Sequence, residues 1–223
     1  MPAPPDGVRP GHLGAIVLGR VIIGDIAATL VDLATRKLVR VEPADGDGWR
    51  LNSLAQSAPR HRLSSLLRYE EALLEGLSEA HTLQELATSL PHTLDRTRSA
   101  IVHDAVHRGW LKHLQHDERT EQGEALTERI QAFRRSLRHL KGTEGPDAFT
   151  GPLLSFALHF GLAEPSWDPL VPFAHDFVAS FTWLPGWRRP EYKKPEVDID
   201  ALNRPTIDEQ IMGVGGAGLA WLL

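Results

Sequence analysis

The chain has 223 residues, of which 42% are hydrophobic and 24% are charged. This composition is typical of globular domains and excludes a wholly disordered or rod-like protein. The sequence has no cysteine, which excludes disulfides, thiolate metal sites and a cysteine nucleophile within these residues. Its formal net charge of −5 disfavours a surface built throughout for phosphate backbones.

The two ends of the sequence bear on its location. Residues 1–6 have neither a basic stretch nor an apolar core, so we expect no signal peptide. The longest apolar tract, residues 211–223, is interrupted by four glycines. It is also shorter than the about 20 residues that a membrane-spanning helix needs. We therefore predict a cytoplasmic protein without a membrane span.

Residues 8–56 are predicted to form a first winged helix-turn-helix unit. Pro10 and Gly19 favour the start and the end of a short helix, and Asp25 is a suitable N-cap for a second helix whose apolar residues recur at helical spacing. A Pro- and Gly-containing turn then separates two β-prone segments, as in a hairpin. The expected elements are the helices 10–18 and 26–34 and the strands 38–41 and 49–51.

Residues 60–141 are predicted to form a second winged-helix unit with flanking long helices. The pattern of residues 25–41 recurs here. In both stretches an apolar helix is followed by basic residues, Arg36-Lys37 in the first and Arg108 before Gly109 in the second, and then by a short strand. Pro91 is expected to end a short helix, because proline disrupts a helix interior. The expected elements are the helices 61–80, 83–90, 93–108 and 120–140 and the strand 109–111.

The remaining sequence changes character. Residues 146–187 are rich in aromatic side chains and are predicted to form a helical cap of two short helices joined near Pro165. Residues 188–223 are predicted to be an extended tail, because Pro and Gly interrupt them repeatedly. The predicted fold class is therefore mainly α with small β-hairpins, in which tandem winged helix-turn-helix units precede a C-terminal helical cap.

Three motifs, spread over roughly residues 9–187, resemble the cytoplasmic region of domain-of-unknown-function family 2207, a family of predicted bacterial membrane proteins. Phe156 and Leu154 stand where the family has Tyr and Pro, and the family's flanking membrane spans are missing here. The resemblance implies a helical and winged-helix cytosolic module, and it implies no particular activity, cofactor or substrate. The motifs are Gly24-Asp25-Ile26-Ala27-Ala28-Thr29-Leu30, Thr120-Glu121-Gln122-Gly123 with Phe133-Arg134, and Leu153-Leu154-Ser155-Phe156 with Trp167.

Nucleic-acid binding is one function that winged helices suggest. Residues 96–141 contain ten Lys and Arg against six Asp and Glu, a local charge of +4 that leaves −9 for the rest of the chain. In the first unit, by contrast, Asp32 on the expected recognition helix would repel phosphate. The alternative interpretation of the basic segment is an ordinary solvated helix face. The candidate nucleic-acid-binding residues are Arg96, Arg98, Arg108, Arg134, Arg135 and Arg138.

Two tryptophans and two arginines lie together in a turn-prone segment near the predicted cap. Trp and Arg are enriched at the energetic centres of protein interfaces. The alternative is that the indoles complete the core of the cap. As candidate partner-binding residues we name Trp183, Trp187, Arg188 and Arg189.

A group of histidines has spacing that a metal site can use. His103 and His107 are four residues apart on one predicted helix, as zinc ligands often are, and His113 and His116 follow. The apolar residues between them define the buried side of that helix, so we expect these histidines to face solvent and predict no metal site.

No catalytic motif stands out in the sequence. It has neither a Gly-rich phosphate loop nor a Gly-x-Ser-x-Gly elbow. The carboxylate pair Glu70-Glu71 is expected to face solvent on an amphipathic helix, and His159 is expected to be a hydrogen-bonded core residue. We therefore predict no catalytic residue and no cofactor.

The favoured function is a non-enzymatic adaptor that binds a protein or peptide partner, in one version along the exposed edge of the hairpin 38–51. Two alternatives stay open at this point. One is a DNA-binding winged-helix regulator, and the other is an enzyme or accessory protein of a biosynthetic pathway.

Overall fold

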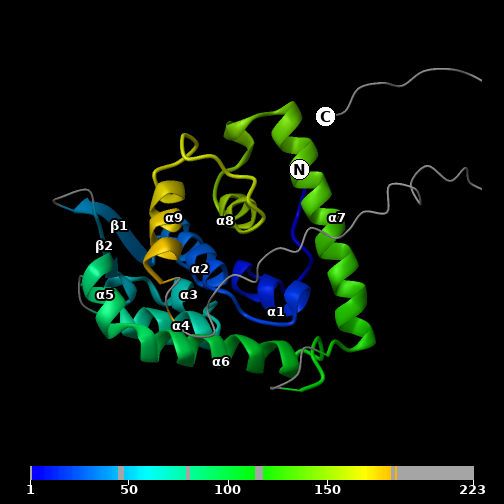
Figure 1. Cartoon of the computed structure of the whole chain (residues 1–223), viewed down its shortest axis with the longest axis horizontal. Helices are drawn as coiled ribbons and strands as arrows, with labels where there is room; N and C mark the ends of the chain where they lie inside the picture. Colours follow the sequence, from blue (N-terminus) through cyan, green and yellow to red (C-terminus); the bar gives the residue numbers. More distant parts are fainter. Residues whose placement is uncertain (1, 45–47, 79–80, 114–117, 182–183, 185–223) are drawn as a thin grey trace, which may run out of the picture. The chain divides into compact units, whose positions relative to one another are not determined.

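The computed structural model describes residues 2–44, 48–78, 81–113, 118–181 and 184 (Figure 1). The chain divides into two compact units, Met1–Arg189 and Pro190–Leu223. The second unit lies outside the described residues, as does the predicted tail over 188–223. Within the described part, no helix is long and apolar enough to cross a membrane.

The fold is mainly helical, at 63%, with one small three-stranded antiparallel sheet in the described residues, which confirms the coarse fold class. The N-terminal elements are the 3-10 helix η1 (Pro10–His12), α1 (Leu13–Leu18), α2 (Ile23–Thr35), β1 (Val39–Ala44) and β2 (Gly48–Ser53). They are followed by η2 (Ala55–Ser57), α3 (Arg60–Leu63), α4 (Arg68–Gly76), β3 (His81–Thr82) and α5 (Leu83–Ser89). The C-terminal elements are α6 (Pro91–His107), α7 (Glu121–Thr143), η3 (Pro146–Ala148), α8 (Pro152–His159) and α9 (Leu170–Phe181).

Helix α2 lies at the centre of the hydrophobic core. Its sequence is apolar on nearly every side, and Leu30, Val31 and Leu33 are fully buried. Such a helix is stable only when other elements surround it, and η1, α8 and α9 pack against α2 (Figure 1). The two helices predicted before residue 35 are confirmed, and Gly19 closes α1 in the left-handed region, at φ 71°. The predicted N-cap is wrong, because α2 begins at Ile23 and Asp25 is its third residue, where it accepts the N–H of Ile22.

The sheet joins segments that the sequence assigned to separate units. Strands β1 and β2 pair in antiparallel register, with Val39 opposite Ser53, so the predicted hairpin is confirmed. Strand β3 was not predicted, and it pairs with β2 through Arg50 and Thr82. The strand predicted at 109–111 is wrong: Leu111 forms only an isolated bridge with Arg119.

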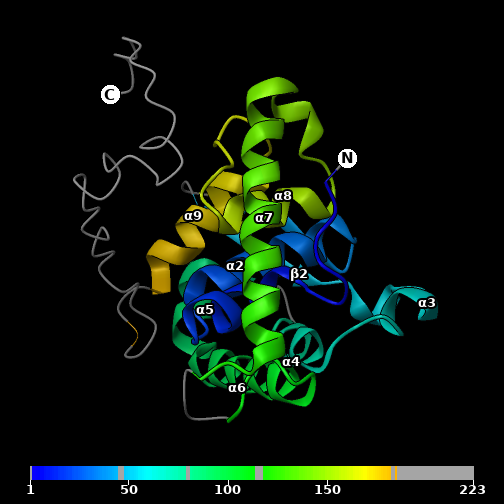
Figure 2. The same cartoon turned by 90° about the vertical axis from the view of Figure 1, so that its right-hand side faces the viewer.

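The long helix predicted over 61–80 is also wrong, because it is broken into α3 and α4. The side chain of Glu70 accepts the backbone N–H of Leu67 at 3.0 Å and so caps a new helix. The chain between the two helices turns, and Figure 2 shows α3 at the edge of the fold, away from α7. The break is set by a carboxylate that the apolar pattern of the segment does not reveal.

The short helix predicted before Pro91 is confirmed as α5, and Pro91 also has a role that was not predicted. Helix α5 ends at Ser89, and Leu90 serves as the C-cap of α5 and the N-cap of α6. Proline then occupies the first turn of α6, where its missing N–H costs no hydrogen bond. Helix α6 therefore begins at residue 91, slightly earlier than expected.

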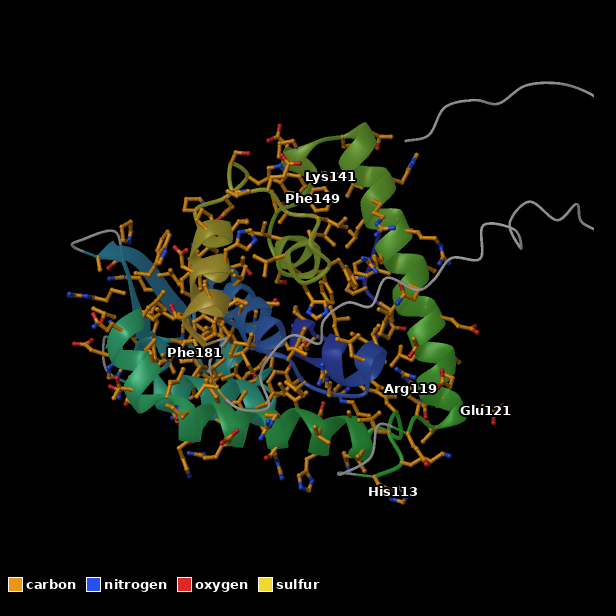
Figure 3. The ribbon with its side chains drawn as sticks, viewed as in Figure 1. His113, Arg119, Glu121, Lys141, Phe149 and Phe181 are labelled. Carbon is orange, nitrogen blue, oxygen red and sulfur yellow. The ribbon has the colours of Figure 1, made fainter. Side chains whose placement is uncertain are left out.

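The aromatic cap consists of two short helices, as predicted. Helices α8 and α9 contribute aromatic side chains to the core, such as Phe156, whose ring meets that of Phe133 of α7 edge to face with centroids 5.3 Å apart. Lys141 at the end of α7 donates to the backbone oxygen of Leu162 at 2.9 Å and lies 5.2 Å from the ring centre of Trp167. Figure 3 shows this lysine beside the aromatic cap. The contacts fasten α7 to the segment between α8 and α9.

The end of α2 has an unusual residue at a position that glycine usually occupies. The N–H of Lys37 donates to the oxygen of Ala34, and the N–H of Leu38 donates to that of Leu33, each at 2.9 Å. This pair of bonds is a Schellman motif, whose penultimate residue adopts a left-handed backbone. Lys37 does so at φ 58°, and no other non-glycine residue in the described part has a positive φ.

Replacing this lysine with glycine is expected to stabilise the fold. In Lys37→Gly the relief of left-handed strain exceeds the added entropy of the unfolded chain, and we expect a gain of about 0.5–1 kcal/mol in the free energy of unfolding. Urea denaturation followed by circular dichroism measures it. Lys37→Ala, which removes the same ammonium group but keeps a Cβ, is the matched control and should bring no such gain. An equal gain in stability in both variants would show that the left-handed backbone of Lys37 is not strained.

Candidate functional site

An open groove lies between α6 and the chain that leads into α4. Its volume is about 580 Å³. Its lining residues on α6 are three or four positions apart, which places them on one face of that helix. We call this cavity the α6 groove, and it is lined by Leu66, Leu67, Arg68, Ala100, His103, Asp104 and His107.

Asp104 is the one carboxylate in the described lining, and its Oδ2 is paired with two neighbours. It accepts hydrogen bonds from His12 Nε2 at 2.8 Å and from Arg108 Nε at 2.6 Å. Burial alone would raise the pKa of Asp104, but these two hydrogen bonds hold it below its ordinary value. The groove therefore has a paired carboxylate on its wall, which is poorly suited to abstract a proton.

His12 is fully buried beneath the groove, and its tautomer is set by its neighbours. The backbone N–H of Arg9 donates to Nδ1 at 3.1 Å. The hydrogen of the neutral ring is therefore on Nε2, which donates a hydrogen bond to Asp104. Burial lowers the pKa of this imidazole below its usual value. The ring also makes edge contacts with Tyr69 and Trp110, each at 5.2 Å between centroids. With both nitrogens in use, His12 positions Asp104 and supports the core.

A second polar cluster joins the end of α2 to the first turn of α4. Nη1 of Arg36 donates to Asp32 and to Glu70, at 2.9 Å in each case. These two carboxyl side chains are only 2% and 1% exposed. Burial alone would lower the pKa of Arg36, but the two carboxylates hold it above its ordinary value. The expectation that Glu70 faces solvent is therefore wrong, because this residue caps α4 and pairs with Arg36.

A third buried carboxyl lies under α1. Asp25 accepts the backbone N–H groups of Gly14 and Ile22 at 2.8 and 2.7 Å, and His159 Nδ1 is 3.2 Å from Oδ1. A Cβ on Gly14 would lie 2.0 Å from the carboxylate, so only glycine fits there. Burial raises the pKa of Asp25 to about 8, despite the two backbone hydrogen bonds. The side chain of His159 is 8% exposed, in agreement with its predicted place in the core.

The predicted nucleic-acid-binding arginines do not gather on one face. On α6, Arg96 pairs with Glu75 at 2.9 Å, Arg98 with Asp95 at 3.0 Å, and Arg108 with Asp104. The other three, Arg134, Arg135 and Arg138, lie in the second half of α7, which diverges from α6 in Figure 1.

The other predicted site residues are only partly described. Trp183, Trp187, Arg188, Arg189 and His116 lie outside the described residues. His103 and His107 are exposed, as expected, and both line the α6 groove. No group of three metal-ligating side chains occurs among the residues that the structure describes. Sequence reasoning missed the groove itself, because its apolar half comes from the irregular chain that was predicted as helix.

In comparisons of the whole chain with protein-family models, with curated proteins and with solved structures, no match is found. The resemblance to domain-of-unknown-function family 2207 therefore stays a prediction.

Asp25 should make the stability of the fold depend on pH. In the folded state the pKa of this carboxyl is raised to about 8, so it stays protonated below that pH. In the unfolded chain its pKa is 3.8, so it has lost its proton well below pH 8. Stability is therefore lost as the pH rises between these two values, by up to about 1.4 kcal/mol per pH unit. We expect the unfolding free energy of the wild type, relative to Asp25→Asn, to fall between pH 5 and pH 8.

Denaturant unfolding at a series of pH values measures this difference. Asp147→Asn, at an exposed carboxylate, is the matched control and should leave the slope of the wild type unchanged. The same slope in the wild type and in Asp25→Asn would show that this carboxyl does not change protonation on folding.

Proposed function

We propose that the chain is a non-catalytic adaptor that binds a peptide segment of a partner protein in the α6 groove. The observation that carries this proposal is the groove itself, at about 580 Å³. This is within the range of about 300–1,000 Å³ that is usual for ligand sites. It lies outside the core, open to solvent along a helix face, as peptide-binding grooves do.

The lining indicates the chemistry of the peptide. Leu66, Leu67 and Ala100 are half-buried and offer an apolar floor for an anchoring side chain. Arg68 is exposed at the edge and is positioned to attract a carboxylate. His103 and His107 add hydrogen-bonding groups from α6. A peptide with an apolar residue beside Asp or Glu fits this arrangement best.

The buried polar groups support a non-catalytic role. Asp104 is paired with His12 and Arg108, and Arg36 holds Asp32 and Glu70. Each of these groups has structural partners, as does Asp25, which accepts the N–H groups of Gly14 and Ile22. None of the three clusters places an unpaired acid or base beside a nucleophile, as a catalytic site requires.

We also interpret part of the fold as a winged-helix arrangement. Helix α4, strand β3, helices α5 and α6 and the Leu111–Arg119 bridge follow one another in the order of a winged helix. In this interpretation α6 takes the place of the recognition helix. Its exposed face then serves a peptide, since its arginines are paired with carboxylates.

Binding to selected peptides tests the adaptor. A random peptide library displayed on phage is panned against the whole chain, and the selected sequences are measured as fluorescent peptides by anisotropy. We expect peptides that combine apolar and acidic residues, with dissociation constants of about 1–100 μM. Replacing their acidic residues with lysine should abolish binding.

Two variants on neighbouring positions of α6 locate the site. Ala100→Glu places bulk and negative charge in the groove and should weaken binding at least about tenfold, which corresponds to about 1.4 kcal/mol. Ser99→Glu adds the same charge on an exposed position that does not line the groove and should leave binding unchanged. If the two variants weakened binding equally, the peptide would not bind in the α6 groove. Tight, salt-dependent binding to random duplex DNA would instead favour the regulator.

A further inference from the structure

A second cavity lies where α2 ends and α3 begins, and its lining is cationic. Its volume is about 430 Å³. No carboxylate belongs to the described lining, and it shares no residue with the α6 groove. We call it the α2–α3 pocket, and it is lined by Thr35, Arg36, Lys37, His61, Arg62 and Ser65.

Two ion pairs hold the guanidinium of Arg36 in place at this pocket. Its Nη1 is bound to the carboxylates of Asp32 and Glu70, whereas its Nη2 is buried and has no hydrogen-bond partner among the described residues. Because Nη2 is shielded from solvent, it is not a ligand contact, and Arg36 contributes its positive charge to the lining of the pocket. Because the two ion pairs already fix the side chain, little entropy is lost when a ligand binds.

Two further cations face the same cavity from different elements. Neither Lys37 at the end of α2 nor Arg62 of α3 forms an ion pair within the described part of the chain. Like charges that converge on one cavity repel each other, and an anion between them turns this repulsion into attraction. The ammonium of Lys37 is present at a backbone position that glycine would occupy at lower cost.

The surrounding charges still favour an anion. The three cations Arg36, Lys37 and Arg62 outnumber the two carboxylates that are bound to Arg36. The negative end of α2 opposes an anion, but the Schellman hydrogen bonds already use the carbonyls of Leu33 and Ala34. The hydroxyls of Thr35 and Ser65 donate to backbone oxygens. The contacts that would bind an anion therefore come from the cationic side chains.

We propose that the α2–α3 pocket binds a phosphate group, as inorganic phosphate or as a phosphate monoester. The guanidinium of Arg62 offers a planar fork for two phosphate oxygens, and the ammonium of Lys37 adds a point charge that suits a dianion. This site goes beyond the adaptor function, because it occupies a different cavity and does not depend on the α6 groove.

Titration of the whole chain with inorganic phosphate tests the proposal. Amide chemical shifts are followed by NMR at constant ionic strength, with chloride as the balancing anion. We expect saturable shifts in residues 35–37 and 60–65, with a dissociation constant of about 1 mM or lower. Shifts that grow linearly without saturation, as general ion screening produces, would overturn the site.

Three variants separate the site from general charge effects. Lys37→Gly and Arg62→Gln should each weaken phosphate binding about tenfold, as expected for the loss of one charge-assisted contact. Lys37→Gly is also expected to be more stable than the wild type, so its loss of binding cannot come from unfolding. Arg60→Gln removes a charge from α3 that does not line the cavity, and it should bind normally. Equal weakening in all three variants would leave only a diffuse basic surface and overturn the pocket.

A parallel titration with O-phospho-L-serine distinguishes the two sources of the phosphate group. Tighter binding than for inorganic phosphate indicates a monoester whose organic part contacts the protein, and weaker binding indicates the free ion. Saturable binding of either compound that is weakened about tenfold in Lys37→Gly supports the site.

Discussion

One nitrogen atom of one side chain, Nη1 of Arg36, satisfies two buried carboxylates. Removing a single partner from such a cluster leaves an unpaired charge in a low dielectric, at a cost of about 3–5 kcal/mol. The cluster also has a geometric consequence. Asp32 belongs to α2 and Glu70 to α4, so the ion pairs fix the start of α4 against the end of the central helix. The chain between these two points forms β1, β2, η2 and α3 before it reaches the start of α4.

The two candidate surfaces follow from this arrangement. Glu70 also caps α4, and its neighbour Tyr69 makes the edge contact with His12 that supports Asp104. A path of contacts therefore leads from the α2–α3 pocket to the wall of the α6 groove. Each cavity takes part of its lining from the irregular chain around α3 and part from a rigid helix. Binding residues are commonly found on such loops that a rigid scaffold positions.

Much of the secondary structure follows from local patterns. The apolar run of α2, the glycine that closes α1 and the turn of the first hairpin are all visible in the sequence. Thr120, which was expected inside the helix 120–140, is instead the N-cap of α7. The break before α4 was missed, because it depends on Glu70 meeting Arg36 across 34 positions of chain. Strand β3 was missed for the same reason, since two residues become a strand only when β2 lies beside them.

The candidate sites were less predictable than the fold. The α6 histidines were rightly expected on the surface, but their neighbours across the groove come from a segment that was predicted as one continuous helix. The basic residues that seemed suited to phosphate are partly paired with carboxylates, while Lys37 and Arg62 were not singled out. Local charge counts sum over a segment, whereas a binding site depends on which cations lack a partner in space.

The buried Asp25 changes the meaning of the charge with which the sequence is first described. The formal value of −5 counts every carboxyl as ionised, but a pKa of about 8 keeps this one neutral at pH 7 in the folded protein. The net charge of the folded protein at pH 7 is therefore one unit less negative than the formal charge of its sequence. Folding takes up a proton from solution, so the heat of unfolding at neutral pH should depend on the ionisation enthalpy of the buffer that receives it.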